Sequence, residues 1–323
     1  MTRALVTGIG GQDGSYLAEL MLERGYEVVG IVRDTRHSYP NLEQVRDRIE
    51  LVQADLLDQN ALVRVLSTHS PTEVYNLASP SFVPMSWQQP VLTAEFAAVG
   101  VTSLLEAIRA VDRTIRVYQA SSSEIFGEPV EVPQSESTPL APVTPYGVAK
   151  AYGHFIVGSY RRRYGLHASC GILYNHESPR RPVDFLPSKV ARAAAAISLG
   201  IESELALGDL EAQRDWGYAA DYVRAMWLML QQDEPGDYVV ATGELHSVRE
   251  LTAAAFAHVG LDWSDHTRVD KTLLRGSAEL HHLVGDSSKA AAQLGWSPSI
   301  GFEELVARLV DSQLAHLRPQ TSS

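Results

Sequence analysis

The sequence predicts a doubly wound α/β fold, in which parallel strands form one sheet with helices on both faces. Through the first half of the chain, apolar runs rich in β-branched residues alternate with helix-like segments. Continuous apolar runs are typical of strands that are buried on both faces. Their alternation with helices implies right-handed crossovers and therefore a parallel sheet.

Each element is expected from its own pattern. Strands are expected at residues 3–8, 26–32, 48–55, 73–79, 115–121, 167–174 and 236–244. Amphipathic helices are expected at residues 14–25, 60–69, 92–110, 146–165, 188–200, 214–231 and 302–317. The regular alternation weakens after residue 174, and no linker rich in Pro, Ser or Gly marks a boundary. We therefore expect a dinucleotide-binding domain in 1–174, to which elements near 211–243 return, and a smaller, interleaved lobe in 175–323.

Composition excludes some classes of protein. The net charge of −12 argues against nucleic acid or an anionic membrane as the main partner. The single cysteine, Cys170, cannot form an intrachain disulfide, and a buried strand cysteine is the simplest interpretation. No signal-like segment and no apolar run long enough to span a bilayer is evident, so a cytoplasmic protein is expected.

A glycine trio, Gly8, Gly11 and Gly14, lies between the first expected strand and the first expected helix. Glycines there allow a tight turn, a close approach of backbone N–H groups to a diphosphate, and close packing of helix on strand. The helix N-terminus adds partial positive charge. A purely structural turn is the alternative, but this position favours a dinucleotide site.

The end of the second strand indicates which dinucleotide binds. Proteins that bind NAD usually carry an acidic residue there for the ribose hydroxyl. Here Val32 is followed by Arg33, with Arg36 nearby. A cation suits the 2′-phosphate of NADP. Asp34 leaves NAD open, because it could pair with Arg33 or bind the hydroxyl itself.

A second group of polar residues has the pattern of a catalytic site. Tyr146 and Lys150 are four residues apart, so on a helix they share a face. An ammonium group close to the phenol would lower its pKa and produce a general base. Ser122, at the end of the neighbouring strand, could bind the same substrate oxygen. Two surface residues on a helix are the alternative.

With these motifs in place, the chain resembles the extended short-chain dehydrogenase/reductases and, within them, closely resembles the GDP-mannose 4,6-dehydratase family. The stretches that carry the resemblance are GIGGQDGSYLAEL, PTEVYNLAS, YQASSSEIFG, SPRRP, RDWGYAADYVRAMWLMLQ and ATGELHSVRE. They cover most of the chain.

The resemblance implies an internal redox reaction on a nucleotide sugar. Tyr146, assisted by Lys150, would remove the proton of the sugar 4-hydroxyl while hydride passes from C4 to the nicotinamide. Glu124 would then take the C5 proton, water would leave from C6, and the hydride would return to C6. The catalytic set is therefore Ser122, Glu124, Tyr146 and Lys150.

The resemblance also assigns binding residues. Those expected at the cofactor are Gly8, Gly11, Gln12, Asp13, Gly14, Arg33, Asp55, Leu56, Leu77, Ala78, Ser81, Tyr146, Lys150, His176 and Arg181. Those expected at the substrate are Ser122, Glu124, Asn175, Lys189, Arg214 and Arg275. No metal is expected. The family pairs through helices corresponding to residues 95–110 and 146–165, so a homodimer or homotetramer is expected.

Departures from the family pattern leave alternatives open. The family usually has threonine where this chain has Ser122, and LASPS and FLPSK replace family sequences near the nicotinamide and the expected base pocket. A dehydratase for another nucleotide-hexose therefore remains open, as does an epimerase or a 4-keto reductase of the superfamily. A nonenzymatic NADP sensor is a third interpretation, against which the retained Tyr146 and Lys150 argue.

Overall fold

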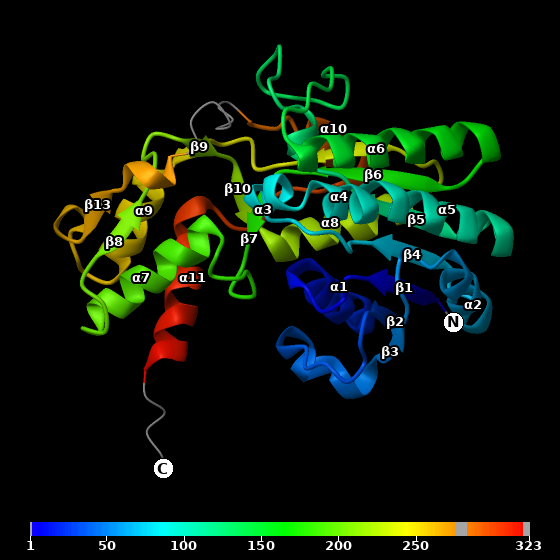
Figure 1. Ribbon diagram of the computed structural model, residues 1–323, viewed down its shortest axis with the longest axis horizontal. Coiled ribbons are helices and arrows are strands. Elements are labelled where there is room, and N and C mark those ends of the chain that lie inside the picture. Colours follow the sequence, from blue (N-terminus) through cyan, green and yellow to red (C-terminus); the bar gives the residue numbers. More distant parts are fainter. Residues whose placement is uncertain (1, 275–282, 319–323) are drawn as a thin grey trace.

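A seven-stranded parallel sheet is the centre of the protein (Figure 1). The computed structural model describes residues 2–274 and 283–318. The strands are β1 (Arg3–Thr7), β2 (Glu27–Val32), β3 (Glu50–Gln53), β4 (Glu73–Asn76), β5 (Arg116–Ala120), β6 (Ala168–Leu173) and β11 (Asp237–Val240). Their order is β11-β6-β5-β4-β1-β2-β3, and every pair is parallel. The doubly wound prediction is confirmed, and all seven expected strands are present.

Helices cover both faces of this sheet. On one face α1 (Gln12–Glu23) packs against α8 (Ala219–Gln231), with α10 (Ser288–Leu294) beside it. On the other face lie α2 (Gln59–His69), α5 (Gly100–Val111) and α6 (Pro145–Tyr164). Each layer has its own apolar core, so both faces of the strands are buried, as their continuous apolar runs indicate.

Local sequence signals set the ends of α6. The Thr144 side chain accepts a hydrogen bond from the backbone N–H of Gly147, and Pro145 occupies the first turn, where its missing N–H is not needed. Gly165 ends the helix at φ 68°, a left-handed conformation that glycine adopts without strain. These signals bring Tyr146 into the first turn of the helix.

A continuous helical run leads into α5 and departs from one expectation. It comprises α4 (Pro90–Ala94), a π-helical turn η2 (Glu95–Val99) and α5. Over Pro90–Val111 it is long and apolar enough to cross a membrane by length and composition, although the sequence analysis expected no such run. Half of it is buried in the protein, where it packs against α2 and α6. A core helix of a globular protein can have the same composition, and packing within the protein accounts for the buried half.

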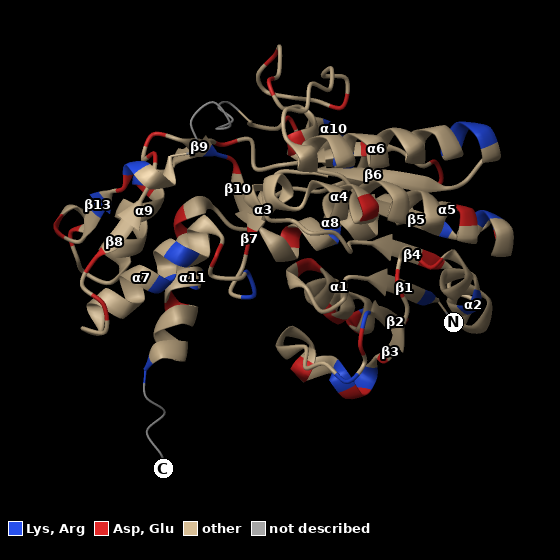
Figure 2. Cartoon of the chain, viewed as in Figure 1, with Lys and Arg blue, Asp and Glu red and all other residues tan. Residues whose placement is uncertain are grey.

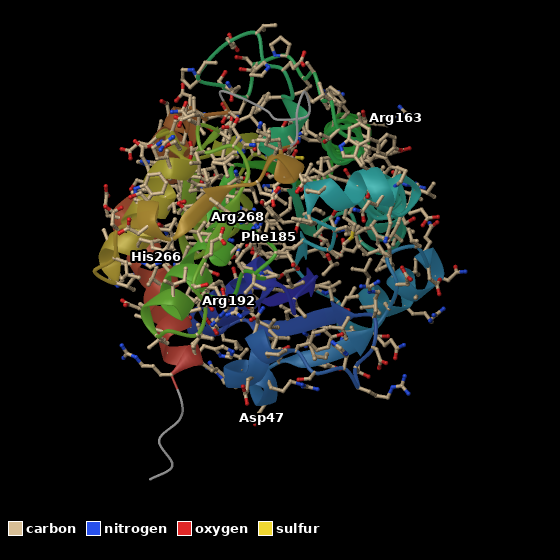
Figure 3. All side chains as sticks on the ribbon, turned by 60° about the vertical axis from the view of Figure 1, so that its left-hand side comes forward. Asp47, Arg163, Phe185, Arg192, His266 and Arg268 are labelled. Carbon is tan, nitrogen blue, oxygen red and sulfur yellow. The ribbon has the colours of Figure 1, made fainter. Side chains whose placement is uncertain are left out.

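A second group of elements lies beside the sheet (Figure 1). It contains α7 (Leu186–Ser198), α9 (Val248–His258), α11 (Phe302–Leu317) and the short parallel pair of β8 (Leu205–Leu207) and β13 (Thr267–Val269). These elements enclose a separate apolar core. In Figure 3 Arg192, His266 and Arg268 lie on this group, and Phe185 lies toward the centre of the view. The helices α9, α10, α3 (Val83–Gln88) and η1 (Pro40–Arg48) were not expected from the sequence.

The chain passes between the two groups more than once. Two small pairs follow β6, namely β7 (Asn175–Glu177) with β10 (Trp216–Tyr218) and β9 (Gln213–Arg214) with β12 (His246–Ser247). After them α8 and β11 return to the sheet. The division into domains at residue 174 stays a prediction. Lys and Arg residues are interspersed with Asp and Glu residues along the chain (Figure 2).

Candidate active site

A large cavity opens at the carboxyl ends of the central strands. Its volume is about 820 Å³, and its lining follows β1, β2, β4, β5 and β6. The strand order reverses between β1 and β4, and ligands of open α/β sheets bind outside the strand ends at such a point. A cavity of this size is in the range that holds a cofactor or a drug-sized ligand.

The glycine loop forms one wall of the cavity. Gly8 has φ +70°, and a Cβ at this position would lie 2.9 Å from the backbone nitrogen of Ala78. A Cβ on Gly14 would lie 2.4 Å from the carbonyl oxygen of Gly8. Gly11 precedes α1 without any side-chain cap, so the first N–H groups of the helix are available to an anion. The loop therefore fits a diphosphate and would be obstructed by side chains.

The structure brings together every residue that the sequence analysis expected at the cofactor. The cavity is lined by Gly8, Gly11, Gln12, Asp13, Gly14, Arg33, Asp55, Leu56, Leu77, Ala78, Ser81, Tyr146, Lys150, His176 and Arg181. The four expected catalytic residues, Ser122, Glu124, Tyr146 and Lys150, line the same cavity. One wall can therefore hold a dinucleotide while the other presents acid–base groups.

Charged residues after β2 have a defined arrangement. Arg36 binds Asp34 through two side-chain hydrogen bonds of 3.0 and 2.9 Å and through its backbone N–H. The hydrogen bonds from Arg36 lower the pKa of the Asp34 carboxyl. Arg33 lines the cavity with its guanidinium 5.9 Å from the centre of the Phe96 ring, and no ion pair to Arg33 is found among residues 2–274 and 283–318. Asp34 is thus engaged by Arg36 rather than by Arg33.

The serine and glutamate cluster forms a short turn after β5. Ser122 accepts a hydrogen bond of 3.3 Å from the backbone N–H of Glu124, and the turn η3 (Ser123–Ile125) follows. The Thr144 hydroxyl lies 3.4 Å from Oε2 of Glu124. A Cβ on Gly147 would lie 2.5 Å from the carbonyl oxygen of Glu124. The absence of a side chain at Gly147 therefore lets the first turn of α6 approach this cluster.

The electrostatics of Tyr146 and Lys150 correct one expectation. Burial raises the pKa of Tyr146 to about 12, and the Ser122 hydroxyl opposes this shift without cancelling it. Burial also lowers the pKa of Lys150 to about 8. The Lys150 ammonium donates a hydrogen bond of 3.0 Å to the carbonyl oxygen of Ala120 and lies 5.6 Å from the centre of the Tyr146 ring. The expected lowering of the phenol pKa by Lys150 is not seen in this structure, because the Lys150 ammonium binds the strand and burial dominates the shift of Tyr146.

Residues of the segment after β6 complete the cavity. Asn175, His176 and Arg181 line it. The Arg181 guanidinium stacks on Phe185 at 3.6 Å, and its Nε lies 3.4 Å from Oε2 of the buried Glu177. Burial raises the pKa of the Glu177 carboxyl. Arg181 is thus held between an aromatic ring and a carboxyl, with access to the cavity.

Two of the described residues expected at the substrate, Lys189 and Arg214, are not part of this lining. The Lys189 ammonium donates 2.8 Å to the carbonyl oxygen of Ala206, and Nη1 of Arg214 donates 2.6 Å to that of Gln213. Neither side chain lines the cavity. Arg275 lies outside the described residues. The structure groups Ser122, Glu124 and Asn175 with the cofactor wall and leaves Lys189 and Arg214 apart from it.

Some lining residues were missed by the sequence analysis. Tyr39 lies over the glycine loop, where a Cβ on Gly10 would be 2.4 Å from its ring. His37, Phe96 and Ser121 also line the cavity. The Ser121 hydroxyl is buried without a hydrogen-bond partner in the described part of the chain. Only Ser121 had a signal in the sequence, its place in the serine cluster.

A cluster outside the cavity has metal-ligand chemistry. Donor atoms of His154, Cys170 and Asp237 lie within 4.8 Å of one another. Arg161 binds both carboxylate oxygens of Asp237, at 2.5 and 3.2 Å. Burial raises the pKa of the Cys170 thiol well above its ordinary value. A guanidinium on the carboxylate and a protonated thiol do not favour a cation.

Comparisons with known proteins agree with this geometry. The model of the family described as GDP-mannose 4,6 dehydratase matches residues 5–309. GDP-mannose 4,6 dehydratase 1 of Arabidopsis thaliana is 48% identical over 96% of this chain and 89% of its own length. The GDP-mannose 4,6-dehydratase of Yersinia enterocolitica is 42% identical over 97% of this chain and 94% of its own. Among solved structures, the dTDP-glucose 4,6-dehydratase DesIV of Streptomyces venezuelae with NAD bound has a TM-score of 0.86 at 26% identity, covering 96% of each chain.

Proposed function

The chain belongs to the GDP-mannose 4,6-dehydratase family, and from that premise we propose that it converts GDP-mannose to GDP-4-keto-6-deoxymannose. It is an enzyme, a nucleotide-sugar 4,6-dehydratase of the carbon–oxygen lyase class. The observation that carries the proposal is the presence of Glu124, Tyr146 and Lys150 in one cavity with the glycine loop. A plain reductase or epimerase of this fold has no need for the carboxylate.

A nicotinamide dinucleotide is the cofactor, and when bound it supplies a reversible hydride acceptor for the sugar. Gly8, Gly11 and Gly14 provide the space for its diphosphate, and the uncapped N–H groups of α1 provide donors. We propose NADP as the preferred form. Arg36 already engages Asp34, which leaves the exposed Arg33 as the charged group for a 2′-phosphate.

Tyr146 is the group that we assign to the sugar 4-hydroxyl. Its phenol is buried in the cavity wall, and Ser122 is the neighbouring hydroxyl that can bind the same oxygen. Because burial keeps the phenol protonated, substrate and cofactor must supply part of the driving force for its ionisation. Lys150, at the adjacent turn of α6, supports it with positive charge.

Glu124 is the group that we assign to C5. The 4-ketone formed by oxidation acidifies the C5 proton, and a carboxylate is a competent base for it. Glu124 is partly buried at the cavity, with the Thr144 hydroxyl near one carboxylate oxygen. Glu124 would then give this proton to the C6 hydroxyl, which leaves as water and leaves a C5–C6 double bond conjugated with the ketone. C6 would accept the hydride held by the bound cofactor and C5 a proton from solvent, which closes an internal redox cycle.

The diphosphate and base of the substrate need further contacts. Asn175 lines the cavity and can bind the sugar. Lys189 on α7 and Arg214 on β9 are proposed for the nucleotide end, as is Arg275, which lies outside the described residues. The elements that carry Lys189 and Arg214 would have to close on the nucleotide, because neither side chain lines the cavity.

Self-association is proposed through α6 and the helices beside it. A groove of about 540 Å³ is lined by Trp87, Pro90, Ala94, Ala98, Pro142, Val143, Thr144, Pro145, Val148, Ala149 and Tyr152. On two of the helices that line it, α4 and α6, Val91 and Phe155 are 70% and 60% exposed. A contiguous apolar surface of this kind is typical of a protein interface. Two copies would bury it as a homodimer, and a homotetramer would need a second contact.

The cytoplasm is the proposed compartment, and the unpaired thiol of Cys170 agrees with it.

The test is to incubate purified protein with NADP and GDP-mannose without added reductant. A 4-keto-6-deoxy product with no net change in the cofactor supports the proposal. Net consumption of NADPH on a keto sugar would identify a reductase, and binding of NADP without turnover of any nucleotide-hexose would identify a sensor. Turnover of another nucleotide-hexose but not of GDP-mannose would keep the chemistry and change the substrate.

A further inference from the structure

Asp13 and His176 form a buried pair at the junction of the glycine loop with the segment after β6. Oδ2 of Asp13 lies 2.9 Å from Nε2 of His176, and Nδ1 of His176 lies 2.7 Å from the carbonyl oxygen of Tyr174. Both partners of the ring are hydrogen-bond acceptors only, if Asp13 is ionised. Both ring nitrogens must then carry protons, so the hydrogen bonds require an imidazolium.

The charges around the pair agree with this assignment. Burial alone would raise the pKa of the Asp13 carboxyl, but the charge and hydrogen bond of His176 outweigh it and lower the pKa to about 2. Burial alone would lower the pKa of His176, but Asp13 raises it above its ordinary value.

Other elements also direct titratable groups at the pair. Arg181 opposes the charge on His176, while the buried Glu177 favours it. From α6 the Lys150 ammonium and the Tyr146 phenol interact with Asp13, as does the Tyr118 phenol from β5. From α8 the Tyr222 ring stacks on the imidazole, with centroids 4.6 Å apart.

The pair is part of a connection between two walls of the cavity. Nε2 of Gln12 donates to Oδ1 of Asp13 at 3.0 Å and to the carbonyl oxygen of His176 at 3.1 Å. The Ser178 hydroxyl donates 2.8 Å to Oε1 of Gln12. The first turn of α1 is thereby fixed to the segment that carries Asn175 and Arg181.

We propose that Asp13 is a positioning residue that acts through His176: it holds the imidazolium against the glycine loop, and retention of the dinucleotide depends on that proton. This inference rests on the proposed function only in taking the cavity as the dinucleotide site. A carboxylate in the first turn of α1 is unfavourable beside a diphosphate. His176 neutralises it, and together they leave the helix N-terminus and Arg181 to attract the anion.

The sign of the pH dependence follows. The pKa of His176 is raised in the folded protein, so the pair is complete below the ordinary histidine pKa and is lost as pH rises through the raised value. Above that value Asp13 is an uncompensated negative charge at the cavity. Dinucleotide affinity therefore falls with rising pH, by up to about tenfold per pH unit for a single linked proton. By reciprocity, binding of the dinucleotide takes up a proton in this range.

The experiment measures NADP binding to cofactor-free protein between pH 6 and 9 by calorimetry, in buffers with different ionisation enthalpies. The expected result is a Kd that rises with pH and a fractional proton uptake near the pH where it rises. Ring resonances of His176, assigned by their loss in His176→Gln, report its titration independently of any ligand.

Asp13→Asn tests the positioning role. Asparagine has nearly the same size and can still bond to the ring, but it carries no charge. His176 should therefore titrate at lower pH in the NMR experiment. The rise of Kd that follows the His176 titration should disappear and leave only the part that Lys150, with a pKa of about 8 in the same cavity, contributes. His176→Gln, a second variant with neutral donors and acceptors, should lack both the proton uptake and the rise.

Glu19→Gln is the matched control. Glu19 also lies on α1 and binds the same segment through Arg180 at 2.6 Å, but it does not line the cavity. Its variant should keep the parental pH dependence. A parental Kd that is constant from pH 6 to 9, or a rise that is the same in Asp13→Asn as in the parent, would overturn the inference and leave the proposed function intact. Failure of any nicotinamide dinucleotide to bind at every pH would instead remove both.

Discussion

The ammonium group of Lys150 donates a 3.0 Å hydrogen bond to the carbonyl oxygen of Ala120, at the end of β5. Burial of this cation lowers its pKa to about 8, so the folded protein carries an electrostatic cost at neutral pH. Such a cost at a catalytic position is typical of active sites that give up stability for chemistry.

Lys150→Met is therefore expected to abolish turnover and to stabilise the protein at pH 7. A difference of about 2.5 pKa units corresponds to roughly 3 kcal/mol, from which the lost hydrogen bond of the charged donor takes about 1.5–2 kcal/mol. We expect a net gain of about 1–2 kcal/mol in the free energy of unfolding. Parental stability rises as pH increases from about 8 toward 10.5, because the folded form releases the proton first, so the gain should shrink over that range.

Denaturant unfolding of cofactor-free protein at pH 7 and pH 10 measures this effect. The matched control is Lys289→Met, whose ammonium binds the carbonyl oxygen of Asp237 outside the cavity. It should give no such gain. A Lys150→Met variant less stable than the parent at pH 7 would show that burial of the cation does not destabilise the folded protein.

Glu124→Gln should divide the reaction in two. Glutamine keeps size and hydrogen bonding but cannot accept a proton, so oxidation at C4 should proceed and dehydration should fall about 10²- to 10⁴-fold. Absorbance of bound reduced nicotinamide should accumulate after mixing with GDP-mannose, and solvent deuterium should not enter C5. Glu128→Gln, an exposed carboxylate in the same loop, is the control. Full dehydration by Glu124→Gln would exclude Glu124 as the base.

Tyr146→Phe should block the earlier step. Without the phenol no group takes the proton of the 4-hydroxyl, so no reduced nicotinamide should appear. The same absorbance measurement, on the same mixing timescale, distinguishes the two variants. Accumulation of reduced cofactor in Tyr146→Phe would assign that proton transfer to another residue.

Cofactor preference should depend on Arg33 and Arg36 in opposite ways. Arg33→Ala should weaken NADP binding about 10- to 100-fold and leave NAD nearly unchanged, because charge-assisted hydrogen bonds contribute about 1.5–3 kcal/mol. Arg36→Ala releases Asp34 and should improve NAD binding. Titration of both dinucleotides measures these constants, with Arg46→Ala on η1 as a control. Tighter binding of NAD than NADP by the parent would indicate that Asp34 governs the ribose.

Self-association should depend on the apolar surface around α6. Phe155→Glu places a charge on it and should shift the protein to monomers in sedimentation at micromolar concentration. The control is Val130, which is 80% exposed and does not line the groove. Val130→Glu adds the same charge there and should leave the assembly unchanged. A parental monomer under these conditions would refute both the dimer and the tetramer.

The fold was predictable from sequence where burial sets a strong pattern. The seven sheet strands have apolar runs and the long helices have apolar residues at helical spacing. The helix α6 also has clear caps at Thr144 and Gly165. The short strands after β6 have two or three residues each, too few to show a period. The helix α9 was not predicted, and its one local signal is the capping box of Ser247 and Glu250. Such elements are determined by tertiary contacts.

The candidate site divides in the same way. Gly8 and Gly14 were predictable because backbone geometry demands glycine. The hydrogen bond of Lys150 to the strand, rather than to the phenol, was not predictable, because packing decides which of several acceptors a long side chain reaches. Tyr39 carried no local signal, since its position over Gly10 depends on the fold of residues 33–48.

The position of β11 in the sheet affects how the chain can fold during synthesis. All six residues of β6 are buried, and β6 pairs with β5 on one side and with β11 on the other. The segment 174–236 must leave the ribosome before β11 can cover its side of β6. Until then this apolar strand edge is unpaired and can pair with strands of other chains. A nascent chain that ends near residue 174 has all the dinucleotide residues up to Lys150 and yet exposes this edge. We therefore expect that fragment to aggregate, and the complete sheet to form only after the C-terminal half has been made.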